Sequence, residues 1–220
     1  MTNILNLDAL QHANLNTEPY PYFTVDKSIA DDAVQAVIAD FPSIQDGGSY
    51  NLEDVKVGPE FDKFLKSLDT PEFRRILCDK FDVDVMDLPM MITLRGYSRK
   101  KDGRIHTDSK TKVLTILIYL NEDWTAETGR LRVLRSGDDM EDYADEIIPG
   151  PGTLMAFKVT DHGWHGYPSF EGKRQSIQIN FLTSAAANSK HRFFHGLSAK
   201  LKKWRRGSPG RLLNGRITDS

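Results

Sequence analysis

The run KVLTILIYL (residues 112–120) is a short apolar segment rich in the aliphatic, β-branched and aromatic residues found in strands. Five similar runs surround it: MMITLRGY (90–97), GRLRVL (129–134), DEIIPG (145–150), GTLMAFK (152–158) and RQSIQINFL (174–182). Turn residues separate these runs, and no helical pattern lies between them. Closely spaced strands without intervening helices predict an antiparallel sandwich, jelly roll or barrel.

The residues before this β-rich segment have helical patterns. Apolar residues on one stripe predict a helix over residues 29–41, with Ser28 as its N-cap. Phenylalanine and leucine spacing indicates a second helix around residues 61–65, and a third is expected to begin near Pro71. The polar segment SIQDGGSYNLED (43–54) contains paired glycines and predicts a mobile loop. The expected fold is therefore mainly β with N-terminal helices.

Composition excludes several classes of protein. The chain has 220 residues, enough for one sizeable core, and a formal net charge of -2 argues against a globally basic nucleic-acid binder. The single cysteine, Cys78, allows neither an internal disulfide nor a Cys-rich metal site. No basic start followed by an apolar run indicates a signal peptide, and no apolar stretch is long enough to span a bilayer. These features predict a cytoplasmic protein.

The C-terminal residues differ from the rest of the chain. Residues 190–211 contain many lysines and arginines and no acidic residue. Leu197, Leu201 and Trp204 are spaced by four and three, which predicts a helix over residues 198–206 that packs one stripe on the core and exposes a cationic face. An anionic partner for this face is the alternative interpretation.

The residues with the clearest chemistry lie in two strings, RIHTD (104–108) and DHGWHGYPSFEGKRQSIQINF (161–181). His106 and Asp108 are two positions apart, so on an extended strand both side chains point to the same face. A second histidine about sixty residues later, His165 or its neighbour His162, completes a set of two histidines and one carboxylate. That set leaves one face of an octahedral metal open, as in non-haem Fe(II) oxygenases. The alternative is that these are ordinary surface or core histidines.

Arg174 supports the metal-site interpretation. Alternation along the strand RQSIQINF places Arg174, Ser176, Gln178 and Asn180 on one face and apolar residues on the other. A polar face inside an all-β core is costly unless it lines a pocket for a polar ligand. An arginine with a hydroxyl two residues later suits a carboxylate, which the guanidinium can bind with two hydrogen bonds. A structural arginine in a salt bridge is the alternative.

The pattern His106-x-Asp108 … His165 … Arg174-x-Ser176 resembles that of the Fe(II)/2-oxoglutarate-dependent oxygenases, closest to the prolyl-4-hydroxylase-like branch. The strings TILIYLNEDW and TGRLRVL are similar to the YLN-x-DW … GG-x-LR string of the hypoxia-sensing prolyl hydroxylases. The resemblance covers roughly residues 89–183. It implies a double-stranded β-helix (jelly-roll) core over 89–183, supported by a helical region over 1–88 and followed by a basic extension over 184–220, in a single domain overall.

The resemblance also implies roles for individual residues. His106, Asp108 and His165 would be the iron ligands, and Arg174 would hold the distal carboxylate of 2-oxoglutarate. Four further residues would line the cosubstrate pocket: Tyr97, Thr115, Tyr119 and Ser176. The chain departs from the hypoxia-sensing branch at Thr128 and Gly129, which replace its paired glycines, so that branch's peptide substrate does not transfer. His165 is favoured over His162 because only His165 has the usual spacing to an arginine.

The function implied is that of a dioxygenase that uses Fe(II), 2-oxoglutarate and O2 to hydroxylate a C–H bond, with release of succinate and CO2. A cupin-like metal enzyme without 2-oxoglutarate, or a non-catalytic jelly-roll module that binds an anion or sugar, are the alternatives. The substrate is open among a protein side chain, a free amino acid and a carbohydrate. Three segments are expected to border the entrance: the loop around Gly47 and Gly48, residues 99–104, and the turn 124–129.

Overall fold

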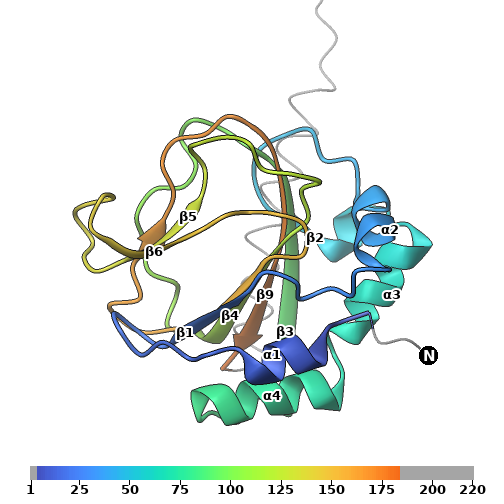
Figure 1. Ribbon diagram of the computed structural model, residues 1–220, viewed down its shortest axis with the longest axis horizontal. Coiled ribbons are helices and arrows are strands. Elements are labelled where there is room, and N and C mark those ends of the chain that lie inside the picture. The colour runs from blue at the N-terminus through green and yellow to red at the C-terminus, as the bar shows by residue number, and fades with distance from the viewer. Residues whose placement is uncertain (1–3, 184–220) are drawn as a thin grey trace, which may run out of the picture.

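Two antiparallel sheets form the body of the protein in a computed structural model that describes residues 4–183 (Figure 1). The larger sheet has the strand order β1-β7-β4-β9-β3-β2, and the smaller sheet has the order β6-β5-β8. The strands are β1 (Tyr22–Val25), β2 (Tyr50–Asn51), β3 (Met90–Ser98), β4 (Lys112–Tyr119), β5 (Leu131–Leu134), β6 (Tyr143–Ile147), β7 (Leu154–Lys158), β8 (His165–Gly166) and β9 (Gly172–Leu182). All six predicted strands are present, and the mainly β fold class is confirmed.

Helices precede the β-rich segment, as predicted. They are α1 (Leu7–His12), α2 (Val34–Ala39), α3 (Pro59–Ser67) and α4 (Pro71–Phe81), with a 3-10 turn η1 (Leu52–Asp54). At α4 the Thr70 hydroxyl accepts a hydrogen bond from the backbone N–H of Phe73, and Pro71 occupies the first turn where no N–H is needed. In Figure 1, α1 and α4 lie side by side below the larger sheet, and α2 and α3 lie to its right.

The predicted helix over residues 29–41 is wrong in its extent. The helix α2 begins only at Val34, and no side chain caps its N-terminus. Ser28 is buried, and its hydroxyl donates a hydrogen bond of 2.7 Å to the carbonyl oxygen of Gly152. A buried hydroxyl must find a partner, so Ser28 joins the start of the chain to the segment before β7 instead of starting a helix.

Five short elements were not predicted from the sequence. They are α1, β1, β8, and the strand β2 with its 3-10 turn inside the segment 43–54 that was expected to be a loop. The two-residue strands β2 and β8 are too short to leave a periodic pattern. Each exists only because it pairs with a distant strand: β2 with β3, and β8 with β5.

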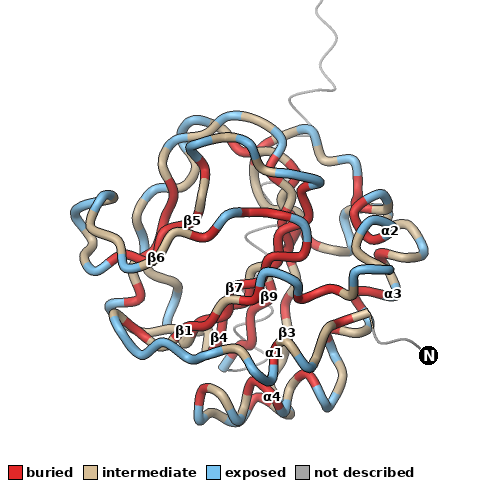
Figure 2. Tube along the Cα trace, in the orientation of Figure 1, coloured by how far each residue is buried: buried red, intermediate tan, exposed pale blue. Residues whose placement is uncertain are grey.

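Most residues of β4, β7 and β9 are buried and are drawn red in Figure 2, and their side chains enter cores on both faces of the larger sheet. One face packs against the helices, through residues such as Ile116, Ile118 and Ile179. The other face packs against the smaller sheet, through residues that include Tyr119, Phe157 and Val133. Alternate residues of β4 therefore enter two different cores, which explains why this strand is apolar almost throughout.

Two further expectations concern the ends of the chain and the membrane. The helix predicted over residues 198–206 lies outside the described residues. Within residues 4–183, none of the helices is long and apolar enough to cross a membrane.

Candidate active site

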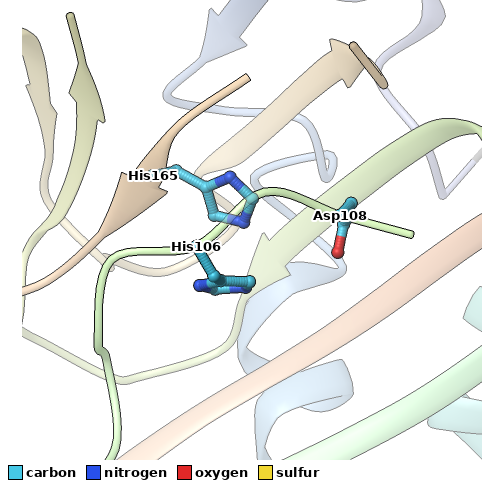
Figure 3. Close-up of side chains that lie close together, drawn as sticks. All are labelled: His106, Asp108 and His165. Carbon is cyan, nitrogen blue, oxygen red and sulfur yellow. The ribbon is translucent and has the colours of Figure 1, made fainter. Parts of the chain in front are cut away.

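Three potential metal ligands meet between the two sheets. His106, Asp108 and His165 each offer one ligand atom, and these atoms lie within 4.8 Å of one another (Figure 3). The three side chains point toward a common centre, although residues 108 and 165 are far apart in the sequence. His165 is buried and His106 is exposed, so the centre is open on one side.

Backbone pairing brings the two histidines together. The N–H of each residue donates to the carbonyl oxygen of the other, both at 3.0 Å, in an isolated antiparallel bridge. His165 belongs to β8, whereas His106 and Asp108 lie in the segment between β3 and β4 and outside any named strand. As predicted, the side chains of His106 and Asp108 point the same way. Their direction is set by the backbone bridge between His106 and His165, because the two residues are not in a regular strand.

Both imidazole rings are oriented by the backbone. Nδ1 of His106 lies 2.9 Å from the carbonyl oxygen of Arg104, and Nδ1 of His165 lies 2.9 Å from that of Gly163. A carbonyl oxygen only accepts, so each Nδ1 carries a proton, and in the neutral ring Nε2 is the nitrogen that keeps its lone pair. This is the arrangement that supporting hydrogen bonds create for metal-binding histidines.

The electrostatics keep His165 and Asp108 in the protonation states that a metal requires. Burial, followed by the nearby charge of His106, lowers the pKa of His165 from 6.5 to about 4, so its ring is neutral near pH 7. Burial alone would raise the pKa of Asp108, but Lys112, with support from His165 and Thr115, holds it below its usual range. Asp108 is therefore a carboxylate.

Two side chains of β4 hold the Asp108 carboxylate. Lys112 donates to its Oδ1 at 2.8 Å, and the Thr115 hydroxyl donates to its Oδ2. The side chains of Lys112 and Asp108 are both more than 90% buried, so the ion pair is shielded from solvent. Thr115 thus contacts a potential metal ligand and also lies on the cavity wall.

A cavity of about 260 Å³ extends from the two histidines between the sheets. Its wall includes four of the residues predicted for the cosubstrate pocket: Thr115, Tyr119, Arg174 and Ser176. Tyr119 lies opposite Ser176 in the β4–β9 pairing, and Arg174, two residues before Ser176, lies on the same face of β9. The alternation predicted for β9 is therefore observed, since Gln178 also lines the cavity.

Arg174 is buried and makes only neutral contacts. Its Nε donates to the carbonyl oxygen of Gly129 at 2.9 Å, and its guanidinium carbon lies 4.0 Å from the ring centroid of Tyr167. Its Nη2 donates to the Tyr119 hydroxyl at 3.4 Å. Among the described residues no carboxylate lies within ion-pair distance of Arg174, so the predicted alternative of a structural salt bridge is not observed. A buried guanidinium without a counter-ion is costly unless an anion joins it.

Two sequence candidates lie elsewhere. Tyr97 does not line this cavity, because a β-bulge between Arg95 and Tyr97 inverts the alternation of β3. Tyr97 then pairs with Lys173 and lines a separate surface hollow, whereas Arg95 pairs with Ser176 and faces the cavity. His162 is exposed and is not part of the histidine–aspartate cluster.

Sequence reasoning missed three residues at this site: Lys112, Tyr167 and Arg95. Tyr167 lines the cavity and stacks on Arg174, and its position between His165 and Arg174 in the sequence was an available signal. Lys112 is four residues from Asp108, and residues at this spacing are expected to be in contact only on a helix, so the spacing did not indicate an ion pair. The predicted entrance segment 99–104 does contribute, through Lys101 to Arg104.

Comparison with known proteins adds to this geometry. Residues 92–182 match the model of the 2OG-Fe(II) oxygenase superfamily, a segment that contains every residue of the metal cluster and Arg174. The match confirms the resemblance and, with it, the expectation of Fe(II), 2-oxoglutarate and O2. A comparison with curated protein sequences finds no match.

Solved structures share the fold. A prolyl-4-hydroxylase from Pseudomonas putida is 18% identical, with a TM-score of 0.54 over 81% of this chain and 93% of its own. The viral collagen prolyl hydroxylase of Paramecium bursaria Chlorella virus-1, as a 2OG complex, is 15% identical with a TM-score of 0.50, over 74% of this chain and 96% of its own. These identities are low, and the likeness establishes the jelly-roll fold.

Proposed function

We propose that this chain, whose residues 92–182 match the 2OG-Fe(II) oxygenase superfamily, is a dioxygenase that hydroxylates a C–H bond of its substrate while 2-oxoglutarate is converted to succinate and CO2. The oxygenase core would occupy residues 89–183, with residues 1–88 as its helical support and 184–220 as an extension. A protein side chain, a free amino acid and a carbohydrate are the substrate classes to be screened.

His106, Asp108 and His165 would hold the iron. Their ligand atoms lie within 4.8 Å of one another, each Nε2 has a free lone pair, and Asp108 is ionised. Two neutral nitrogens and one carboxylate oxygen form the donor set that suits Fe(II) and leaves positions open for other ligands. When bound, iron and 2-oxoglutarate supply the O2 activation that the protein side chains lack.

The observation that carries the proposal is the buried Arg174 without a carboxylate partner, in the same cavity as the two histidines. Gly129 and Tyr167 hold its guanidinium on two sides, which leaves its remaining N–H groups for an anion. A carboxylate of 2-oxoglutarate would neutralise it and accept two hydrogen bonds. A cupin-like enzyme without this cosubstrate would have no need for such an arginine.

The remaining residues of the cavity orient and shield the reactants. Lys112 and Thr115 fix the Asp108 carboxylate, so its orientation does not depend on the metal. Tyr119, Leu131 and Tyr167 provide apolar surface close to Arg174, which lowers the local dielectric and strengthens its interaction with an anion. The cavity thus combines a polar end at the metal with a second polar end at Arg174.

The test is the iron-dependent release of succinate from 2-oxoglutarate by the purified protein. We expect slow uncoupled turnover that requires added Fe(II) and disappears in His106→Ala and Asp108→Ala, because both remove a ligand. His12→Ala, at an exposed histidine of α1, is the matched control and should behave as the wild type. Metal binding without succinate release would favour the cupin-like alternative, and absence of both would favour a non-catalytic binding module.

A further inference from the structure

The cavity wall carries more positive charge than the cosubstrate explains. Four basic side chains line it, Arg95, Lys101, Arg104 and Arg174, against one acidic side chain, Asp102. If the proposed function is correct, Arg174 is used by 2-oxoglutarate. Three cations then remain beside the open face of the metal centre.

Asp102 does not neutralise these three cations, because its carboxylate already forms an ion pair with Arg99. Its carboxylate accepts from the backbone N–H of Arg99 at 3.0 Å, from Nε at 3.1 Å and from Nη2 at 2.9 Å. These contacts satisfy both carboxylate oxygens with one guanidinium. They also close a turn that holds the segment 99–102 in place.

Arg95 is the innermost of the three cations. In the larger sheet it lies opposite Ser176, which in turn lies opposite Tyr119, so the three residues form one row on the cavity face. Arg95 is half-buried, and its Nε donates to the Ser49 hydroxyl at 3.0 Å. Among the described residues no carboxylate lies within ion-pair distance of its guanidinium.

Lys101 and Arg104 lie at the mouth of the same cavity, on a segment with a defined backbone. The carbonyl oxygen of Arg104 accepts from Nδ1 of His106, and that of Gly103 accepts from the N–H of Tyr167 at 2.8 Å. Both side chains are exposed, and neither has an ion-pair partner in residues 4–183. The rest of the chain offers little: residues 1–3 and 184–220 contain a single acidic side chain, that of Asp219.

We propose that the substrate of this site is anionic and that Arg95, Arg104 and Lys101 bind its oxyanion group, a phosphate or a carboxylate, next to the metal centre. Two of the three are arginines, whose planar N–H groups match oxyanions with paired hydrogen bonds. Their placement around one opening also raises the local concentration of anions. This inference rests on the proposed function, because it takes Arg174 to be occupied by 2-oxoglutarate.

The experiment uses the full chain loaded with Mn(II) in place of Fe(II), which prevents turnover and relaxes nearby nuclei, with 2-oxoglutarate at saturation for each variant. Phenyl phosphate, benzoate and neutral benzyl alcohol are titrated, and their 31P or 1H relaxation rates are measured. We expect saturable relaxation of an anionic probe and none of benzyl alcohol. Whichever of phosphate and carboxylate binds more tightly identifies the group.

The double variant Arg95→Gln/Arg104→Gln should weaken binding of the anionic probe by about tenfold or more, as expected for loss of charge-assisted hydrogen bonds. Arg75→Gln, at an exposed arginine of α4, is the control and should leave it unchanged. Equal relaxation of benzyl alcohol, no saturable relaxation of either anionic probe in the presence of 2-oxoglutarate, or unchanged affinity in the double variant would each overturn the inference. If Mn(II) or 2-oxoglutarate itself fails to bind, the proposed function fails first, and with it this inference.

Discussion

His162 and His165 are three residues apart, and only His165 reaches the metal-binding cluster. Replacing His165 with alanine removes one of three ligands, so we expect the affinity for Fe(II) or Mn(II) to fall by at least tenfold. His162→Ala should change it little, because that side chain is exposed and outside the cluster. Metal titration followed by electron paramagnetic resonance of Mn(II) measures both. Equal losses in the two variants would contradict the assignment of His165 as a ligand.

Arg174 is the second residue whose surroundings predict a measurable effect. Arg174→Ala removes the unpaired buried cation, so the concentration of 2-oxoglutarate needed for half-maximal succinate release should rise by about tenfold or more. Metal affinity should be retained, since Arg174 does not contact the three ligands. An unchanged 2-oxoglutarate requirement would show that the cosubstrate, if used, binds elsewhere.

A change at Thr115 tests whether the hydrogen bond that holds Asp108 in place contributes to metal affinity. Thr115→Val keeps the β-branched shape of the side chain but removes the hydroxyl that donates to Asp108. Metal affinity should fall by roughly ten- to a hundredfold, the range typical for loss of such a supporting contact. Thr24→Val, in β1 and away from the cavity wall, serves as the control. An equally small loss of metal affinity in Thr115→Val and Thr24→Val would mean that Lys112 alone holds the Asp108 carboxylate.

At the scale of elements, the turn between β4 and β5 is built to present one carbonyl oxygen to Arg174. Gly129 has a φ of +77°, and a Cβ there would lie 2.8 Å from Phe170 and 2.9 Å from Trp124, so only glycine fits. The rings of Trp124 and Phe170 are 4.8 Å apart, and the indole N–H donates to the Thr128 carbonyl oxygen at 3.3 Å. The two rings therefore hold the turn whose Gly129 carbonyl accepts from Arg174.

Trp124→Ala should loosen this turn and raise the KM for 2-oxoglutarate several-fold, with little change in kcat, because the metal ligands are untouched. Trp124→Phe keeps an aromatic ring against Phe170 and should restore most of the affinity. Steady-state succinate release separates KM from kcat. A fall in kcat with unchanged KM, in either variant, would contradict a role in positioning Arg174.

At the scale of the whole molecule, the buried His165 ties folding stability to pH. Its pKa is lowered to about 4 in the folded protein and is about 6.5 in the unfolded chain, so folding favours the neutral ring. This contribution is complete well above pH 6.5 and is lost progressively as the pH falls through 6.5 toward 4. Between pH 7 and pH 5 the metal-free protein should lose about 2 kcal/mol of unfolding free energy from this residue.

Urea unfolding at the two pH values, with a chelator present, measures that loss. The variant His165→Asn has no group that titrates in this range, so its stability should depend less on pH by about the same amount. If the wild type and His165→Asn lose equal stability between pH 7 and pH 5, the imidazole is not kept neutral by burial. Saturation with Mn(II) should raise the unfolding free energy at pH 7 and make its fall toward pH 5 steeper, because a metal binds only the deprotonated ligands of the folded state.

The sequence by itself determined the features that depend on neighbouring residues. Alternation along β9 placed Arg174, Ser176 and Gln178 on one face, because the side-chain period of a strand is local. The start of α4 was likewise readable from Thr70 and Pro71, whose capping and φ preferences act within one turn. The ligand set His106, Asp108 and His165 was readable by resemblance, and the structure brings its members together.

The tertiary structure alone decided what depends on distant partners. A register shift between β3 and β9 after Arg95 turned Tyr97 away and left Arg95 on the cavity face, and such a one-residue shift is set by the pairing of the two strands, which the alternation of one strand does not encode. Ser28 became a buried contact of Gly152 because a partner 124 residues away was available to it. The grouping of Arg95 with Arg104 on one cavity wall was decided in the same way, because the pairing of β3 with β9 places Arg95 there, whereas the contact of Arg99 with Asp102 is local. Hydrogen bonds and ion pairs across such distances depend on how the sheets close, which no local spacing encodes.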